Sequence, residues 1–76
     1  MKDKRFEKLL NLTITKQDLE SLLIRLGFEK KPGKGSHVKW LKAHCPPIIV
    51  ATHSKEIKHY QLRQIIKILK DYNLIT

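Results

Sequence analysis

The 76-residue sequence contains one cysteine, no long apolar run and few acidic residues. Cys45 alone cannot form an intramolecular disulfide, and small secreted domains usually depend on such bonds, so a reducing compartment is favoured. No apolar stretch approaches the roughly 20 residues that cross a bilayer. The charged first residues are not followed by the apolar region of a signal peptide. We therefore expect a cytoplasmic protein with no membrane partner.

The shortage of acidic residues leaves a large excess of positive charge. Sixteen Lys and Arg residues stand against seven Asp and Glu residues, which gives a formal net charge of +9. In so small a domain this charge attracts polyanions and speeds their encounter. Nucleic acid is the first candidate partner, an acidic protein the second and an anionic membrane the third.

The length predicts a single domain over residues 1–76. A chain this short buries only about 60% of the surface that its unfolded form exposes, so its core must be compact. Hydrophobic residues make up 41% of the chain, which is enough for such a core. We interpret residues 1–12 as a basic lead-in with a short helical turn, and residues 13–75 as the core of the domain.

Apolar spacing predicts two helices. Leucines at i, i+3, i+4 and i+7 indicate a helix over Lys16–Leu26. Thr15 stands before it as a capping hydroxyl, and Gly27 follows where a left-handed residue often ends a helix. The same spacing predicts a second helix from about His59 to Asp71.

Three short strands are predicted between the helices, over Phe28–Lys31, Ser36–Leu41 and Ile48–Ala51. The turn segments Pro32–Gly35 and Ala43–Pro47 separate them. This order indicates an α+β fold with a three-stranded antiparallel sheet. Both helices have one apolar face, so we expect both to cover the same face of the sheet.

Side-chain alternation in the middle strand separates its residues into two sets. Val38 and Trp40 point one way and form the expected core pair, so His37 and Lys39 point to the opposite face. With helices on one side only, this second face meets solvent. An imidazole and an ammonium group are therefore expected on an open, basic sheet face.

The turn before the middle strand is rich in lysine and glycine. Lys30, Lys31 and Lys34 supply charge, and Gly33 and Gly35 allow backbone N–H groups to approach an anion closely. A solvated hairpin turn has the same composition. The spacing alone leaves both interpretations open.

Four short motifs, in this order, resemble the HicA (YcfA-like) toxin family. They are Leu26-Gly27-Phe28, Gly33-Lys34-Gly35-Ser36-His37, Thr52-His53-Ser54-Lys55-Glu56-Ile57-Lys58 and Leu62-Arg63-Gln64-Ile65-Ile66. The resemblance covers about residues 18–74. It implies a double-stranded-RNA-binding-domain-like fold of order α-β-β-β-α, mRNA cleavage, a HicB antitoxin partner and a catalytic histidine in the Gly-Ser-His motif.

That histidine is His37 in this sequence. Histidine titrates near neutral pH, so its imidazole suits a general base that takes the proton of a ribose 2′-hydroxyl. Lys34 and Lys39 would counter the charge that develops on the attacked phosphate. This route needs no metal ion or cofactor. The expected protein is a metal-independent endoribonuclease toxin.

The chain departs from the family pattern after the motif, where members often have a further histidine and an aromatic residue. Here Val38, Lys39 and Trp40 follow. The departure keeps the key histidine and affects the expected substrate contacts. The residues expected to bind RNA are Lys30, Lys31, Lys34, Gly35, Ser36, Lys39 and His53.

Several residues have a structural alternative. His53 lies between hydroxyl residues that typically serve a turn, so it is either structural or a second proton carrier. Trp40 is either a core residue or a stacking platform for a base. The basic residues of the last helix form either a phosphate-binding face or a solvated surface; they are Lys58, Arg63, Lys67 and Lys70. The histidines and Cys45 match no zinc spacing, and we expect no metal site.

Two other functions compete with the enzyme. A non-catalytic RNA-binding module of the same fold would share nearly every residue except a catalytic role for His37. A membrane-active protein would fit the charge and the amphipathic helices, but the predicted strands around Trp40 argue against it.

Overall fold

The computed structural model describes residues 4–51 and 57–75. Its elements, in chain order, are α1 (Lys4–Leu10), α2 (Lys16–Arg25), β1 (Glu29–Pro32), β2 (His37–Leu41), β3 (Ile48–Ala51) and α3 (His59–Asp71). From α2 onward the order is α-β-β-β-α, as the family resemblance implied, and the α+β class is confirmed. None of the helices in the described ranges has the length and hydropathy that a bilayer span requires.

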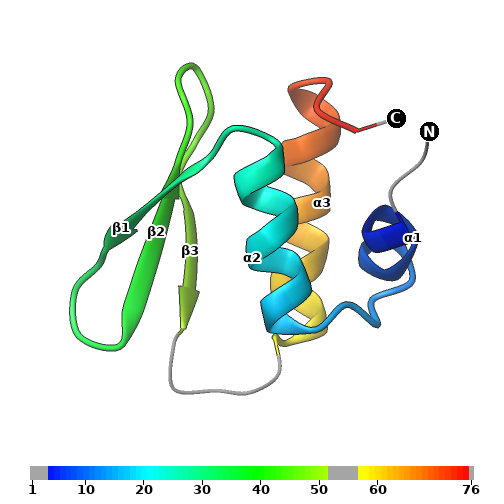
Figure 1. Ribbon diagram of the computed structural model, residues 1–76, viewed down its shortest axis with the longest axis horizontal. Coiled ribbons are helices and arrows are strands. Elements are labelled where there is room, and N and C mark those ends of the chain that lie inside the picture. The colour runs from blue at the N-terminus through cyan, green and yellow to red at the C-terminus, as the bar shows by residue number, and fades with distance from the viewer. Residues whose placement is uncertain (1–3, 52–56, 76) are drawn as a thin grey trace.

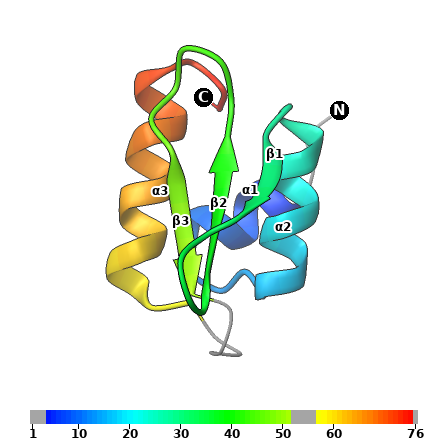
Figure 2. The same ribbon diagram turned by 90° about the vertical axis from the view of Figure 1, so that its left-hand side faces the viewer.

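The three strands form one antiparallel sheet in the order β1-β2-β3. Figures 1 and 2 show α2 and α3 side by side behind this sheet, so both helices cover one face, as expected. The register places Trp40 beside Lys30 on β1 and Ile48 on β3. The other face of the sheet is left open toward the viewer of Figure 2.

The ends of α2 follow the sequence prediction. The Thr15 hydroxyl accepts a hydrogen bond from the Asp18 amide at 3.1 Å, which satisfies one of the free N–H groups of the first turn. Gly27 has a φ of +95°, and its amide donates to the Ile24 carbonyl. The Phe28 amide donates to Leu23, which completes a Schellman motif.

This motif also explains where β1 begins. Because the Phe28 N–H is used by the helix end, pairing in the sheet starts one residue later than predicted, at Glu29. The strand continues to Pro32, which has no N–H and is tolerated because β1 is an edge strand.

The hydrophobic core lies between the sheet and the helices. Its buried members include Trp40 of β2, which is 1% exposed, and they come from the three helices, from β2 and β3, and from the segments that flank α2, whereas β1 contributes none. They are Leu9, Ile14, Leu19, Leu22, Leu23, Phe28, Trp40, Ile48, Val50, Leu62, Ile65 and Leu69. The burial of Trp40 confirms its predicted role in the core.

Helix α1 forms a third layer, on the side of α2 and α3 that faces away from the sheet (Figure 1). Its residue Leu9 is completely buried. The predicted helical turn in the lead-in is therefore a full helix, and the hydrophobic core begins inside residues 1–12.

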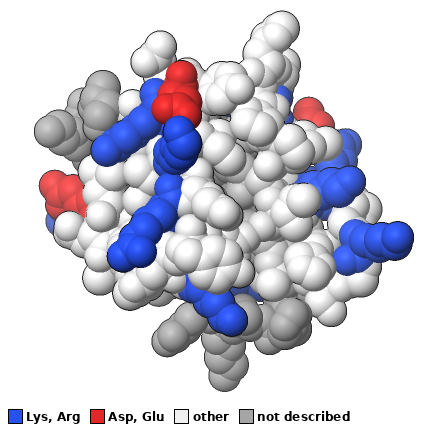
Figure 3. Space-filling model, turned by 180° about the vertical axis from the view of Figure 1, so that it is seen from behind, with Lys and Arg blue, Asp and Glu red and all other residues white. Residues whose placement is uncertain are grey.

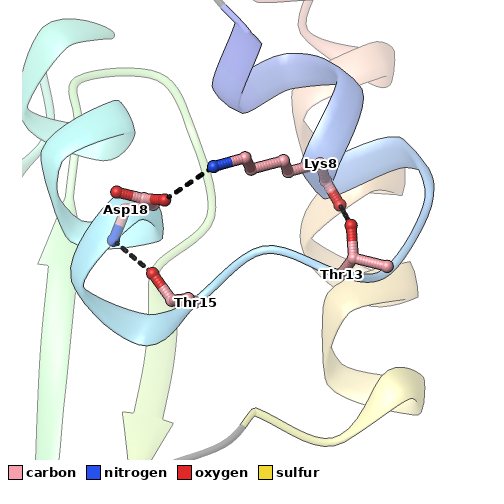
Figure 4. Close-up of polar contacts among 4 residues, drawn as sticks. All are labelled: Lys8, Thr13, Thr15 and Asp18. Atoms are coloured by element: carbon pink, nitrogen blue, oxygen red, sulfur yellow. Dashed lines mark hydrogen bonds and ion pairs between the residues drawn. The ribbon is translucent and has the colours of Figure 1, made fainter.

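Polar contacts join α1 to α2 (Figure 4). The Lys8 ammonium lies 3.5 Å from the Asp18 carboxylate, and the Thr13 hydroxyl donates to the Lys8 carbonyl at 3.3 Å. The linking residue Leu12 has a φ of 60°, a left-handed conformation that is unfavourable for a branched side chain. Tertiary packing must supply the free energy that holds this connection.

We predict that Leu9→Ala lowers the free energy of unfolding by about 2–5 kcal/mol, because it leaves a cavity in the core. The matched control is Leu10→Ala, on the neighbouring residue, which is 42% exposed and should cost less than about 0.5 kcal/mol. Urea denaturation of both variants measures the difference. Equal losses would show that α1 is not part of the cooperative core.

Candidate functional site

His37 is the first residue of β2, and its side chain is exposed. It pairs with Ala51 at the end of β3. The β1–β2 turn and the first turn of α3 lie at this same end of the molecule (Figures 1 and 2). The histidine thus lies beside the lysine-containing β1–β2 turn, at the end of the molecule where α3 begins.

The turn before β2 holds this histidine in place. The Gly33 amide donates to the His37 carbonyl at 2.9 Å. A Cβ on Gly33 would lie 2.6 Å from that carbonyl oxygen, so the close approach of the two backbones requires glycine. Gly35 has a φ of +64°, which lets the chain reverse between the two strands.

The imidazole makes a contact that selects its tautomer. Its Nδ1 lies 3.3 Å from the Lys34 carbonyl oxygen. A carbonyl can only accept a hydrogen bond, so Nδ1 must carry the hydrogen when this bond forms. In the neutral ring, Nε2 then has the lone pair and can accept a proton.

The open face of the sheet carries the side chains that alternate with the core residues. Lys39 lies on this face with His37, as predicted, because Val38 and Trp40 pack toward the helices. Its partners across the strands are Lys31 on β1 and Ile49 on β3.

Two lysines therefore stand directly opposite each other. Like charges at cross-strand positions destabilise a sheet. Glu29 lies 3.4 Å from the Lys31 ammonium, but both side chains are exposed and solvent weakens their attraction. The Lys31–Lys39 pair is a local conflict in the fold, of the kind that a bound anion would relieve.

Lys30 does not join this group. It lies on the helix-covered side of the sheet, with its Nζ 5.9 Å from the centroid of the Trp40 ring and 3.3 Å from the Glu20 carboxylate. Its contacts explain its position: the ammonium covers the edge of the core and pairs with α2.

The other expected RNA contacts divide into two groups. Lys34, Gly35 and Ser36 are exposed in the turn next to His37. His53 lies outside the described residues, so its expected role stays a prediction.

An apolar strip on the same face was missed by the sequence interpretation. Ile49 is 46% exposed and Leu41 is 39% exposed, and both lie on the His37 side of the sheet. The run Ile48–Ala51 was predicted as a strand, without a division of its residues into two faces. Alternation around the core residues Ile48 and Val50 would have placed Ile49 outside.

Among the described residues, His37 and the pair His44 and Cys45 lie far apart along β2. His44 and Cys45 lie in the turn between β2 and β3, at the end of β2 opposite to His37 (Figure 2). Within residues 4–51 and 57–75, no group of three or more His, Cys, Asp or Glu side chains is arranged to hold a metal ion.

Taken together, these features define a small basic α+β domain that presents a histidine beside a lysine pair on an open sheet face. Residues 17–71 match the family model of the HicA toxin of bacterial toxin-antitoxin systems, which is well over half of the chain. The chain belongs to the HicA toxin family, as the resemblance in its motifs implied. Helix α1 precedes the matched segment. Comparisons with curated proteins and with solved structures found no match.

Proposed function

We propose that this toxin is an endoribonuclease that cleaves mRNA in the cytoplasm, with His37 as its general base. The observation that carries the proposal is the exposed imidazole, held through Nδ1 by the Lys34 carbonyl on the sheet face that also carries Lys31 and Lys39. Membership of a toxin family supports a cellular target, and RNA is the polyanion that offers a hydroxyl group next to each phosphate.

The reaction follows from the position of the lone pair. Nε2 of His37 accepts the proton of a ribose 2′-hydroxyl, and the oxygen attacks the adjacent phosphorus. The new O2′–P bond forms as the P–O5′ bond breaks. The leaving 5′ oxygen takes a proton from solvent or from the imidazolium, which gives a 2′,3′-cyclic phosphate and a 5′-hydroxyl.

The lysines supply the electrostatic part. Lys39 and Lys31 lie on the same face as His37, and Lys34 lies in the adjoining turn. Their ammonium groups would stabilise the additional negative charge on the phosphate in the transition state. Because these charges are supplied by side chains, the proposed route contains no metal ion.

His37→Ala is expected to lower the rate of RNA cleavage by about a hundredfold to ten-thousandfold, the usual range for a general base. The control is His44→Asn, which changes an exposed histidine at the far end of β2 and keeps a residue that tolerates its φ of 66°. Purified proteins and a labelled single-stranded RNA give the rates.

The same assay distinguishes the enzyme from a non-catalytic RNA-binding module. A substrate with a 2′-deoxy nucleotide at the cleaved position should resist the wild-type protein. Equal RNA integrity with wild type and His37→Ala would favour the binding module. Cleavage of the deoxy substrate at a comparable rate would exclude the proposed nucleophile.

Neutralising one lysine of the opposed pair should reduce activity and raise stability. We expect Lys39→Gln to lower cleavage roughly tenfold, through lost phosphate stabilisation, while raising the free energy of unfolding by up to about 1 kcal/mol. Lys30→Gln is the matched control, since it removes the same charge from the neighbouring strand on the other side of the sheet. Its cleavage rate should stay within about twofold of wild type; equal losses in both variants would point to net charge alone.

Family membership implies an antitoxin partner, and we assign this role to a HicB-type protein. An acidic surface that covers the open sheet face would exclude RNA and relieve the repulsion between Lys31 and Lys39. Adding stoichiometric antitoxin should therefore abolish cleavage. A complex that cleaves RNA at the rate of the free toxin would rule out occlusion.

A further inference from the structure

A line of exposed side chains runs along α3, away from the core. Tyr60, Arg63, Lys67 and Lys70 follow one another at spacings of three and four residues, so they share one stripe of the helix. The opposite stripe is buried against the sheet and α2. Seen from behind in Figure 3, basic side chains form a line over the region of α3, and further basic side chains lie on the side of the molecule where the sheet is.

The positive charge of this α3 stripe is largely uncompensated. Asp71 is the one acidic residue within the helix, and it pairs with Lys67 at 3.2 Å. Within the described parts of the chain, Arg63 and Lys70 form no ion pair with an acidic residue. A helix surface in ordinary contact with water usually mixes both charge signs.

The stripe begins close to the candidate active site. The first turn of α3 lies at the same end of the molecule as the start of β2 (Figures 1 and 2). The Gln61 side-chain amide donates to the Ile49 carbonyl, and Ile49 is the strand partner of Lys39. This bond fixes the start of α3 against the strand beside the lysine pair.

At the head of the stripe stands Tyr60, which is 60% exposed. From there to Lys70 the helix rises about 15 Å. Single-stranded nucleic acids are bound by this combination of an aromatic ring, on which a base stacks, and a series of cations along the backbone. An acidic protein could use the cations, but it would not require an exposed tyrosine ring in line with them.

We propose that the α3 stripe is a second binding surface for single-stranded RNA. An RNA strand that is cleaved at His37 passes the edge of β3 and stacks one base on Tyr60. Its phosphates then contact Arg63, Lys67 and Lys70. This inference rests on the proposed ribonuclease function, and it makes substrate binding extend several nucleotides beyond the cleaved bond.

The test measures binding of a single-stranded RNA of about 20 nucleotides to protein carrying His37→Ala, which leaves the substrate intact. In this background, Arg63→Gln/Lys70→Gln should reduce the slope of log K against log salt by about 1.4, since each contact with a single strand contributes about 0.7. The matched control, Lys4→Gln/Arg25→Gln, removes the same two charges from α1 and α2 and should leave the slope unchanged.

Tyr60→Ala should weaken binding by about fivefold to a hundredfold, whereas Tyr60→Phe, which keeps the ring, should bind as the parent does. Circular dichroism of all variants verifies that the exposed substitutions leave the fold intact. Both readouts are independent of cleavage, so an RNA that the wild-type protein binds on this stripe without cutting it would contradict the proposed function and leave this inference standing.

The second part of the test measures RNA cleavage by protein that keeps His37. The α3 double variant should slow cleavage of long RNA and leave cleavage of a four-nucleotide substrate unchanged. An unchanged salt slope together with unchanged cleavage of long RNA would overturn the proposal. It would also be overturned if the double variant weakened only antitoxin binding, because the stripe would then serve an acidic protein.

Discussion

The placement of Trp40 in the core is the constraint on which the candidate site depends. In a strand, adjacent side chains point to opposite faces, so burying one residue determines the direction of all the others. With Trp40 buried between the helices and Ile48, His37 and Lys39 have no alternative to the open face. A slip of one residue in the β2 register would bury both polar side chains and expose the tryptophan, at a cost of several kcal/mol. The burial that stabilises the fold thus also orients the histidine.

The side chains on the open face of the sheet lower the stability of the fold. Lys31 and Lys39 face each other, and Ile49 and Leu41 remain exposed. None of these features improves the isolated fold. All of them are consistent with a surface that is complete only when an anion or a partner covers it. In this sense the conflict between stability and charge is more informative about function than the net charge of +9, which does not say where the charge acts.

Most of the fold could be predicted from the sequence because its local rules agree with one another. The cap at Thr15, the left-handed Gly27 and the two apolar stripes gave helix and strand limits close to those observed. The sheet face to which His37 points could be predicted from the alternation of side chains along β2 alone. The same reasoning would place Lys30 on the helix-covered face, since it pairs with Trp40, but the register of β1 was not known from the sequence. Helix α1 was underestimated because a seven-residue element has little periodicity of its own and is stabilised by packing of Leu9.

Helix α1 and the open sheet face both affect how much surface this small domain buries. A chain of this size has little surface to bury, and a sheet that leaves one face to solvent gives up part of it. The third layer recovers some of that burial on the far side of α2 and α3, where Leu9 is fully enclosed. Stability is thereby gained at a distance from the site, and the connection through Leu12 is held in an unfavourable conformation to achieve it. Because α1 lies behind the helices, it adds to the core without covering the open sheet face on which His37 lies.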